Sequence, residues 1–431
     1  MLLALAGSAL LLAACGNPPG PRGWAPARPV VVGDREFVLA PHKSHVYAVR
    51  PESSFVQWQF PPEDRNSYPI SQQRLEGLLE LIDALEVTEQ QKEDLISLAE
   101  GLTVSGGSDD ALRDALTDAV GDEQRNAIND FIDDTRDTEN RGLRDVRALY
   151  GEIAISSDAE TAYVGAFGGW VFAIETATGQ ARWIIETGDE MVGGVAIDGD
   201  TIFFGTKGEE VFAVGAESGE FVWRFETSGE VWATPTIAES AIYVSSMDGV
   251  LHKLDAEGNE TWSFDSAGAG IAASATVSGD TVYIGSFDKK LYAVNTADGV
   301  MRWSIAADNW FWGQPAVADG MVFAPSLDGK VYAVNEDDGE EVWTFDAGAP
   351  VRSAPAVVED SLIVAARDGD VFKLDLQTGE RVGGALVVGS TIESNLTPDD
   401  DGAVFVVPRD ATLYVIDATE NLTANTYPLT R

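Results

Sequence analysis

The phrase that decides the fold recurs along this chain, as IFFGTKGEEVFAVGAESGEFVWRF at residues 202–225, VYIGSFDKKLYAVNTADGVMRWSI at 282–305 and VFAPSLDGKVYAVNEDDGEEVWTF at 322–345. A marker residue, aromatic or histidine, stands at the centre of each copy. Successive markers are 40 residues apart, at Phe172, Phe212, His252, Tyr292, Tyr332 and Phe372. Two outlying copies surround Tyr47 and Tyr414, which makes eight. A fixed period of this length indicates one supersecondary unit that is copied and stacked.

Each copy has the pattern of four short strands. In the copy around Tyr332, β-branched and aromatic residues are frequent at 314–317, 321–324, 330–334 and 341–345, and Gly and Asp lie between these runs. Such runs separated by turn residues are typical of strands and hairpins. Four strands with their turns use roughly 40 residues, the size of a propeller blade. The sequence therefore predicts an all-β fold, an eight-bladed β-propeller of four-stranded antiparallel blades.

A tryptophan follows the marker in six copies, 11 residues on in five of them and 10 residues on in one. These residues are Trp58, Trp183, Trp223, Trp303, Trp343 and, at the shorter spacing, Trp262. One indole can bury about 150 to 250 Å², so we interpret the six as structural residues that dock each blade on its neighbour. A glycine suited to a turn with positive φ stands seven residues after the marker in five copies, at Gly179, Gly219, Gly299, Gly339 and Gly379.

The period is interrupted once, because Tyr47 and Phe172 are 125 residues apart. Within residues 61–149 the apolar residues change from alternation to helical spacing, as at Leu75 and Leu78. We therefore predict an α-helical insertion of three to five helices between the first and second blades.

This insertion separates blade 1, residues 29–60, from blades 2 to 8, residues 150–431. The insertion begins after the outermost strand of blade 1 and ends at the innermost strand of blade 2. Because neighbouring strands alternate in direction, it begins and ends on the face that carries the loops between second and third strands. We expect the helices to cap, or stand beside, that mouth of the ring.

The N-terminus has the pattern of an export signal. Residues 1–14 form an apolar run that is too short to span a bilayer. The letters LAAC at 12–15 resemble a lipobox, and this resemblance implies that Cys15 becomes the lipidated first residue of the mature protein. An incidental cysteine in an ordinary signal is the alternative. No Lys or Arg precedes the run, so a start upstream of Met1 stays open.

Residues 15–28 contain four prolines and favour a stiff tether behind the lipidated cysteine. We therefore expect an exported protein that is lipid-anchored to the cell envelope. The anchor would hold it either at the outer membrane, facing the periplasm, or on the outer face of the cytoplasmic membrane.

The chain is strongly acidic, with 71 Asp and Glu against 28 Lys and Arg and a formal net charge of -43. Such a surface repels nucleic-acid phosphates and anionic lipid headgroups, so we expect no nucleic-acid partner. It favours basic partners, cations or a salty habitat.

The repeat itself, for example YIGSFDKKLYAVNTADGVMRW at 283–303, resembles the PQQ-like β-propeller repeat. Eight such blades in a lipoprotein resemble the BamB family of the outer-membrane β-barrel assembly machinery. The resemblance covers residues 29–60 and about 151–430. It implies a non-catalytic scaffold of the cell envelope, with envelope proteins such as the barrel-assembly components as partners.

The same repeat also serves quinoprotein dehydrogenases, which hold a quinone with calcium, an Asp base and often a vicinal cysteine pair. Cys15 is the only cysteine here, and no matching Glu, Asn and Asp set can be placed. No phosphate loop, nucleophile elbow or H-E-x-x-H motif is present either. We predict no enzymatic activity and no cofactor, and keep a quinoprotein-type dehydrogenase as the third hypothesis.

Twenty residues before the marker, the residue type differs between blades. The positions are Val192, Trp232, Ala272, Trp312 and Arg352, with Trp310 close by. They lie at the starts of innermost strands, which face the central channel. Aromatic rings beside an arginine suit a peptide, a sugar or a planar ligand. We take Trp232, Trp310, Trp312 and Arg352 as the candidate mouth. The alternative is that these indoles plug the channel or pack under the helices.

Aspartates recur four residues before the marker, at Asp248, Asp288, Asp328, Asp368 and Asp410. A ring of carboxylates could bind a cation, but repetition in so many blades favours a role in closing the turns. His42 and His45 share one loop, and a metal site needs convergent ligands with a second shell. We predict no metal site.

The sequence thus favours a monomeric, membrane-anchored scaffold that binds envelope proteins. A ligand-binding or sensory lipoprotein that uses the channel mouth is the alternative. Ring closure stays open, because the last copy has only a weak outer strand at 426–430 and the chain before Pro29 could add an edge strand there.

Overall fold

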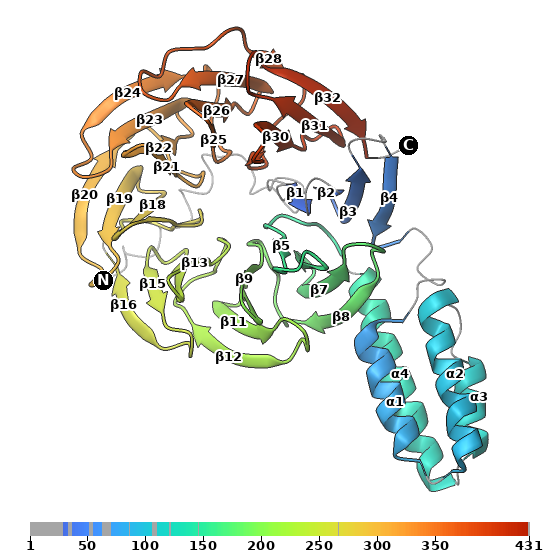
Figure 1. Ribbon diagram of the computed structural model, residues 1–431. Helices are drawn as coiled ribbons and strands as arrows, with labels where there is room; N and C mark the ends of the chain where they lie inside the picture. The colour runs from blue at the N-terminus through green and yellow to red at the C-terminus, as the bar shows by residue number, and fades with distance from the viewer. Residues whose placement is uncertain are drawn as a thin grey trace, which may run out of the picture.

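The computed structural model describes residues 29–32, 37–50, 55–62, 70–85, 87–105, 110–119, 122–144, 146–265 and 267–429. In this part of the chain, eight four-stranded sheets are arranged as blades around a ring (Figure 1). Every sheet consists of consecutive strands paired antiparallel, from the innermost to the outermost. The predicted eight-bladed propeller is confirmed. Cys15, residues 1–14 and the tether at 15–28 lie outside the described residues.

The first four blades have these bounds. Blade 1 contains β1 (Val30–Val32), β2 (Phe37–His42), β3 (His45–Arg50) and β4 (Phe55–Phe60), and blade 2 contains β5 (Ala154–Ile155), β6 (Thr161–Ala166), β7 (Trp170–Glu175) and β8 (Ala181–Glu186). Blade 3 contains β9 (Ala196–Asp198), β10 (Thr201–Gly205), β11 (Glu210–Gly215) and β12 (Phe221–Glu226), and blade 4 contains β13 (Thr236–Ala238), β14 (Ala241–Ser245), β15 (Leu251–Leu254) and β16 (Glu260–Phe264).

The remaining blades continue around the ring. Blade 5 contains β17 (Thr276–Ser278), β18 (Thr281–Gly285), β19 (Lys290–Asn295) and β20 (Met301–Ala306), and blade 6 contains β21 (Ala316–Ala318), β22 (Met321–Pro325), β23 (Lys330–Asn335) and β24 (Glu341–Asp346). Blade 7 contains β25 (Ala356–Val358), β26 (Ser361–Ala365), β27 (Asp370–Asp375) and β28 (Leu386–Val387), and blade 8 contains β29 (Thr397–Pro398), β30 (Ala403–Val406), β31 (Thr412–Asp417) and β32 (Thr423–Pro428).

The marker residues all lie on third strands, where the register explains their spacing. In blade 6, Tyr332 of β23 pairs with Ala324 of β22 and Thr344 of β24. The pairing of β23 with β24 shifts between Ala333 and Val334, and blades 1 to 5 carry the same irregularity at the matching place. Such a bulge adds local twist to a strand. The core is divided among the blades, since buried clusters combine the facing sides of neighbouring sheets.

Each of the six tryptophans packs against the next blade along the chain. Each indole N–H donates a hydrogen bond to a backbone carbonyl there, from Trp58 to Thr176, Trp183 to Ala216, Trp223 to Ala256, Trp262 to Thr296, Trp303 to Glu336 and Trp343 to Leu376, at 2.9 to 3.1 Å. The turn glycine of the receiving blade lies beneath the ring. Gly339, with φ of 73°, has room for no side chain, because a Cβ there would fall 2.7 Å from the Trp303 ring.

Blades 7 and 8 have no tryptophan at this place, and their outer strands differ. In blade 7, β28 pairs with β27 only at Asp370 and Val371. Lys373 of β27 replaces the indole contact by donating from Nζ to the carbonyls of Ala418, Thr419 and Glu420, at 2.6 to 3.1 Å.

Blade 8 has four strands from its own copy, and β32 pairs with β31 along its whole length. The outer strand therefore begins earlier than the weak one expected at 426–430. Among the described strands, no sheet takes strands from both ends of the chain. Blades 8 and 1 meet through side chains, including Phe405 and Leu413 against Val38 and Tyr47. The Thr397 hydroxyl also donates to the Pro29 carbonyl at 2.6 Å.

The insertion between blades 1 and 2 contains four helices in its described part, within the predicted range. They are α1 (Gln72–Asp83), α2 (Glu89–Ser105), α3 (Asp110–Ala119) and α4 (Asp122–Arg144). They enclose an apolar core of their own, which includes Leu78, Ile82, Leu116 and Ile132. No helix in the described ranges is long and apolar enough to cross a membrane.

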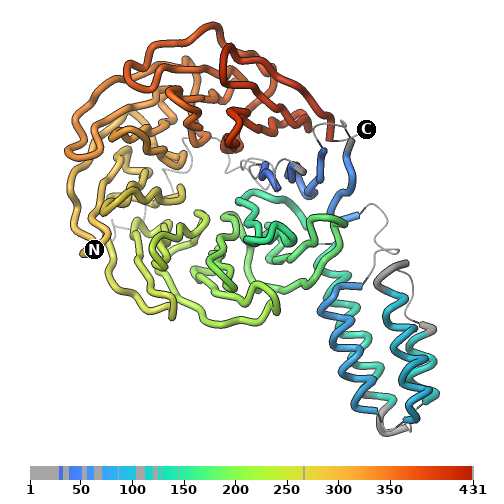
Figure 2. The backbone as a smooth tube through the Cα atoms, in the orientation of Figure 1, coloured from blue at the N-terminus to red at the C-terminus, as the bar shows by residue number. Residues whose placement is uncertain are grey.

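The helices project outward from the rim of the ring and do not cover the channel (Figures 1 and 2). Of the two expected arrangements, capping of the mouth is therefore wrong. The reason is the apolar surface offered by blade 2. Leu143, at the end of α4, packs in one cluster with Trp170 and Ile184 of β7 and β8, and Arg141 lies over the Trp170 ring. This surface faces away from the axis, so the helices follow it outward.

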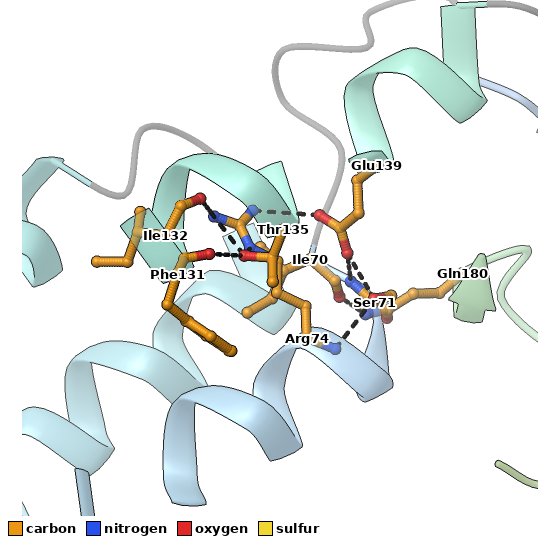
Figure 3. A network of polar contacts seen from close by, with 8 residues as sticks. All are labelled: Ile70, Ser71, Arg74, Phe131, Ile132, Thr135, Glu139 and Gln180. Carbon is orange, nitrogen blue, oxygen red and sulfur yellow. Dashed lines mark hydrogen bonds and ion pairs between the residues drawn. The ribbon is translucent and has the colours of Figure 1, made fainter. Parts of the chain in front are cut away.

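A polar network fixes the start of α1 against α4 and blade 2 (Figure 3). Ser71 caps α1 by accepting a hydrogen bond from the Arg74 N–H, and its own hydroxyl donates to Glu139 at 2.5 Å. Arg74 lies 3.1 Å from the same Glu139 carboxylate, and both side chains are largely buried. The Gln180 amide donates to the Ile70 carbonyl. The network thus connects both ends of the insertion to the turn before β8.

Candidate functional site

The channel mouth lies at the starts of the innermost strands. A pocket of about 110 Å³ opens there, and seven of the eight blades supply its lining. Trp232, Trp312 and Arg352 are among the lining residues, so three of the four residues chosen from the sequence meet at one place. Trp310 is not part of this lining. A second cavity of about 340 Å³ lies along the innermost strands of blades 2 to 4.

Aromatic rings form a stack beside the pocket. Trp310 stacks on Phe287 with ring centroids 4.6 Å apart, and Phe287 stacks on Trp312 at 5.0 Å. The Arg352 guanidinium carbon lies 4.2 Å from the centre of the Trp312 ring. A cation this close to an indole face is attracted by the ring quadrupole. The stack therefore ends in a positive charge at the pocket.

Arg352 belongs to a charged cluster around one carboxylate. The Glu393 side chain has no exposed surface, and it lies 3.8 Å from Arg352, 2.9 Å from Arg367 and 2.6 Å from Arg409. Burial lowers the pKa of Arg352 to about 10, with Arg367 and Arg409 adding to the decrease and Glu393 opposing it. Arg352 is therefore still protonated at neutral pH. Three guanidinium groups thus meet at one buried carboxylate.

The opposite side of the mouth combines aromatic rings with paired charges. Val192 and Phe167 form a small apolar cluster together with Tyr150 and Trp232. Lys207 lies 2.8 Å from Glu190, and this hydrogen bond raises the pKa of Lys207. The Trp232 indole N–H donates to Glu230 at 2.6 Å.

The sequence analysis missed Phe287, Arg367, Arg409 and Glu393. The first three occupy the position five residues before the marker, directly before the turn aspartate, and this position also varies from blade to blade. Its occupants are His42, Phe167, Lys207, Met247, Phe287, Leu327, Arg367 and Arg409. The same argument from variation would have found it. Glu393 has no such signal, because the spacing between the last two markers departs from 40 residues.

The aligned aspartates serve the turns, as repetition suggested. In every case one carboxylate oxygen accepts the backbone N–H two residues on, as from Lys330 to Asp328 at 3.0 Å. The other oxygen of Asp328 accepts the Tyr332 hydroxyl at 2.7 Å, and together with burial this raises the pKa of Tyr332. Among the described residues, no three His, Cys, Asp or Glu side chains are grouped to hold a metal ion.

Comparisons with known proteins give a family and a fold. The sequence model of the family described as outer membrane protein assembly factor BamB matches residues 168–274 and 248–426, more than half of the chain. A comparison with curated protein sequences finds no match.

Two solved structures are similar in fold. The crystal structure of BamB from Moraxella catarrhalis has a TM-score of 0.55 and 19% identity, and the match covers 64% of this chain and 87% of that one. The computationally designed Ika8 protein has a TM-score of 0.57 and 16% identity, covering 64% of this chain and 85% of that one. At these identities the two structures show the shared propeller fold alone.

Proposed function

Because this chain belongs to the family of the outer membrane protein assembly factor BamB, we propose that it is a non-catalytic scaffold that holds a protein partner in the cell envelope. The family and the propeller fold support a protein-interaction role. A part in outer-membrane protein assembly, with barrel-assembly components as partners, is the finer proposal that the family suggests.

The observation that carries this proposal is the asymmetry of the mouth. Positions that repeat in the blades serve packing, as the six docked indoles and the turn aspartates do. Positions that vary meet on one face, where they place aromatic and cationic groups around the pocket. Aromatic and arginine side chains are the residues that most often carry the binding energy of protein interfaces.

A lipid anchor at Cys15 would place this face near the membrane. The Pro29 carbonyl accepts a hydrogen bond from the Thr397 hydroxyl, just as the Ala275 carbonyl accepts one from the Thr236 hydroxyl. Ala275 directly follows residues that line the pocket. Pro29, the first described residue, therefore lies toward the mouth. Pro29 is 14 positions after Cys15, and a chain of that length spans at most about 50 Å. An anchored scaffold would thus present its mouth within that distance of the lipid.

Site-specific photo-crosslinking in intact envelopes tests the proposal. A crosslinking residue at Trp310 should capture a discrete envelope protein, and one at Glu217 should not, because Glu217 is exposed in the turn between β11 and β12 on the opposite face. The variant Cys15→Ser should be released from membranes and lose most of this crosslinking, since the anchor raises local concentration. Equal capture from both faces, or none from either, would contradict the scaffold role.

The pocket also favours a second candidate, a ligand-binding or sensory lipoprotein. The space of about 110 Å³ beside Trp312 and Arg352 is lined by aromatic and small apolar residues with a few polar groups, as small-molecule sites commonly are. Native mass spectrometry of protein purified from its host distinguishes the two. A bound small molecule with no crosslinked partner supports the sensor.

A further inference from the structure

Three asparagines of this chain stand in the sequence Asn-x-Thr, which is the acceptor pattern for N-glycosylation of exported proteins. They are Asn259, Asn395 and Asn421, and the middle residue is Glu or Leu, never Pro. The pattern is short, so it identifies a modification site only where the folded chain presents the asparagine to solvent. The structure separates the three asparagines on this point.

Asn259 and Asn421 lie in equivalent hairpins of two blades. Asn259 is in the connection between β15 and β16, and Asn421 is in the connection between β31 and β32. Both residues are exposed, and so are the threonines of their acceptor patterns, Thr261 and Thr423. Because third strands end on the face opposite the mouth, both hairpins lie on that face. Blades 4 and 8 lie across the ring from each other (Figure 1).

Asn395 is in a different environment. Its Oδ1 accepts the Ala354 backbone N–H at 2.9 Å, and its Nδ2 lies 3.5 Å from a carboxylate oxygen of Glu152. The residues on both sides of it, Ser394 and Leu396, are buried. Asn395 also lines the pocket at the mouth. A sugar on its Nδ2 would therefore disturb contacts that join blades 7 and 8.

The surroundings of Asn259 are compatible with a sugar. Its Nδ2 lies 3.0 and 3.2 Å from the two carboxylate oxygens of Asp255 in the same hairpin. A primary amide has two N–H groups, so one can be replaced while the other still donates to Asp255. Blade docking is also unaffected, because Gly258, and not Asn259, is the residue beneath the Trp223 ring.

We propose that Asn259 and Asn421 are N-glycosylated and that Asn395 is not. The donor is an oligosaccharide carried on a lipid phosphate. The asparagine Nδ2 forms a bond to the anomeric carbon of the sugar, the bond from this carbon to the phosphate oxygen of the carrier breaks, and Nδ2 loses one proton. The proposal rests on the envelope location in the proposed function, since the acceptor pattern is used in exported proteins. Two glycans on the opposite face leave the mouth open to a partner.

Mass spectrometry of the full-length protein, purified from membranes of its own host, tests the proposal. We expect two oligosaccharide increments on the intact protein, which peptide sequencing locates at Asn259 and Asn421. The variants Asn259→Gln and Asn421→Gln should each lose one increment, and the double variant should lose both. Each of the two sites is judged by its own increment.

Substitutions of Thr261 provide matched controls that keep the asparagine. Thr261→Ser retains the acceptor pattern and should retain the increment at Asn259, whereas Thr261→Val breaks the pattern and should lose it. A sugar on Asn395, or membrane-bound protein without any increment, overturns the proposal. Crosslinking at Trp310 in unmodified protein would still support the scaffold role. Protein confined to the cytoplasm would instead contradict the envelope location itself, so the two failures are distinguishable.

Discussion

At the scale of single residues, packing positions and mouth positions are distinguished by what they contact. Trp183 is buried against blade 3, where its N–H bonds the Ala216 carbonyl. Such an indole combines a large apolar burial with one satisfied donor. Trp312 lies instead between Phe287 and Arg352 at the pocket. The same residue type therefore has two uses, and only the neighbours separate them.

His42 occupies the position five residues before the marker, whose residue type varies between blades. It ends β2, where it is 5% exposed, and neither ring nitrogen has a hydrogen-bond partner among the described residues. Burial lowers the pKa of His42, and Lys43 and His45 add to this while Asp410 opposes it. The buried ring is thus adapted to the neutral form.

We predict a loss of stability in mild acid that originates at His42. An unfolded histidine titrates near pH 6.5. Because the folded pKa is lower, the unfolded chain binds more protons as the pH falls below that value, and the free energy of unfolding decreases. The free energy of unfolding in urea should change less between about pH 7.5 and 5.5 for His42→Leu than for the natural chain. Identical differences in both proteins would contradict the prediction.

At the scale of elements, the insertion behaves as a bundle with its own core and a narrow attachment. Its buried residues pack on each other, as Leu78 does on Ile132 in one cluster, while Leu143 and the Ile70 carbonyl meet blade 2. Leu75 and Leu78, which indicated the helical spacing, are buried, although Leu98 of α2 is 40% exposed. The bundle is therefore held mainly at the turn before β8 and the end of α4.

We predict that Arg74→Met destabilises the insertion by about 3 to 5 kcal/mol, because Glu139 would keep a buried charge without its ion partner. The matched control is Arg113→Met, which removes an ion pair with Asp133 whose carboxylate is half exposed; it should destabilise the insertion far less, because solvent screens an exposed pair. Unfolding followed by the far-ultraviolet helical signal measures both. Equal losses of stability in the two variants would contradict the prediction that the buried Arg74–Glu139 pair contributes more than the exposed pair.

At the scale of the whole molecule, the ring has one joint of a different kind. Blades 1 to 6 each place an indole on the following blade, and blade 7 places Lys373 there. Blade 8 meets blade 1 through apolar side chains and the hydrogen bond from Thr397 to Pro29. No described strand is shared across this joint. Opening of the ring should therefore begin between β29–β32 and β1–β4.

Hydrogen exchange measured by mass spectrometry tests this expectation. Under native conditions, amides of β1, β2, β30 and β31 should exchange before those of β18 and β19 in blade 5, because sub-global opening follows the least stable contacts. The prediction fails if blade 5 exchanges as early as blade 1 or earlier.

Much of the fold could be predicted from the sequence, because it depends on local sequence patterns. The markers from Tyr47 to Tyr414 lie on third strands because a period of 40 residues copies one sheet, and tryptophans at one offset must dock in one way. The helical spacing around Leu75 likewise follows from an apolar face that has to be buried. Trp232, Trp312 and Arg352 could be grouped because a ring brings equivalent positions to one axis.

The sequence by itself thus determined the number of blades, the strands within them and the presence of the helices, since these depend on spacing along the chain. Only the tertiary structure decided where the helices point, how blade 8 meets blade 1, and that Glu393 lies among Arg352, Arg367 and Arg409. The reason is that those features depend on which surfaces from distant blades come into contact. The charge balance in a buried cluster depends on such contacts, and the repeat pattern does not predict it.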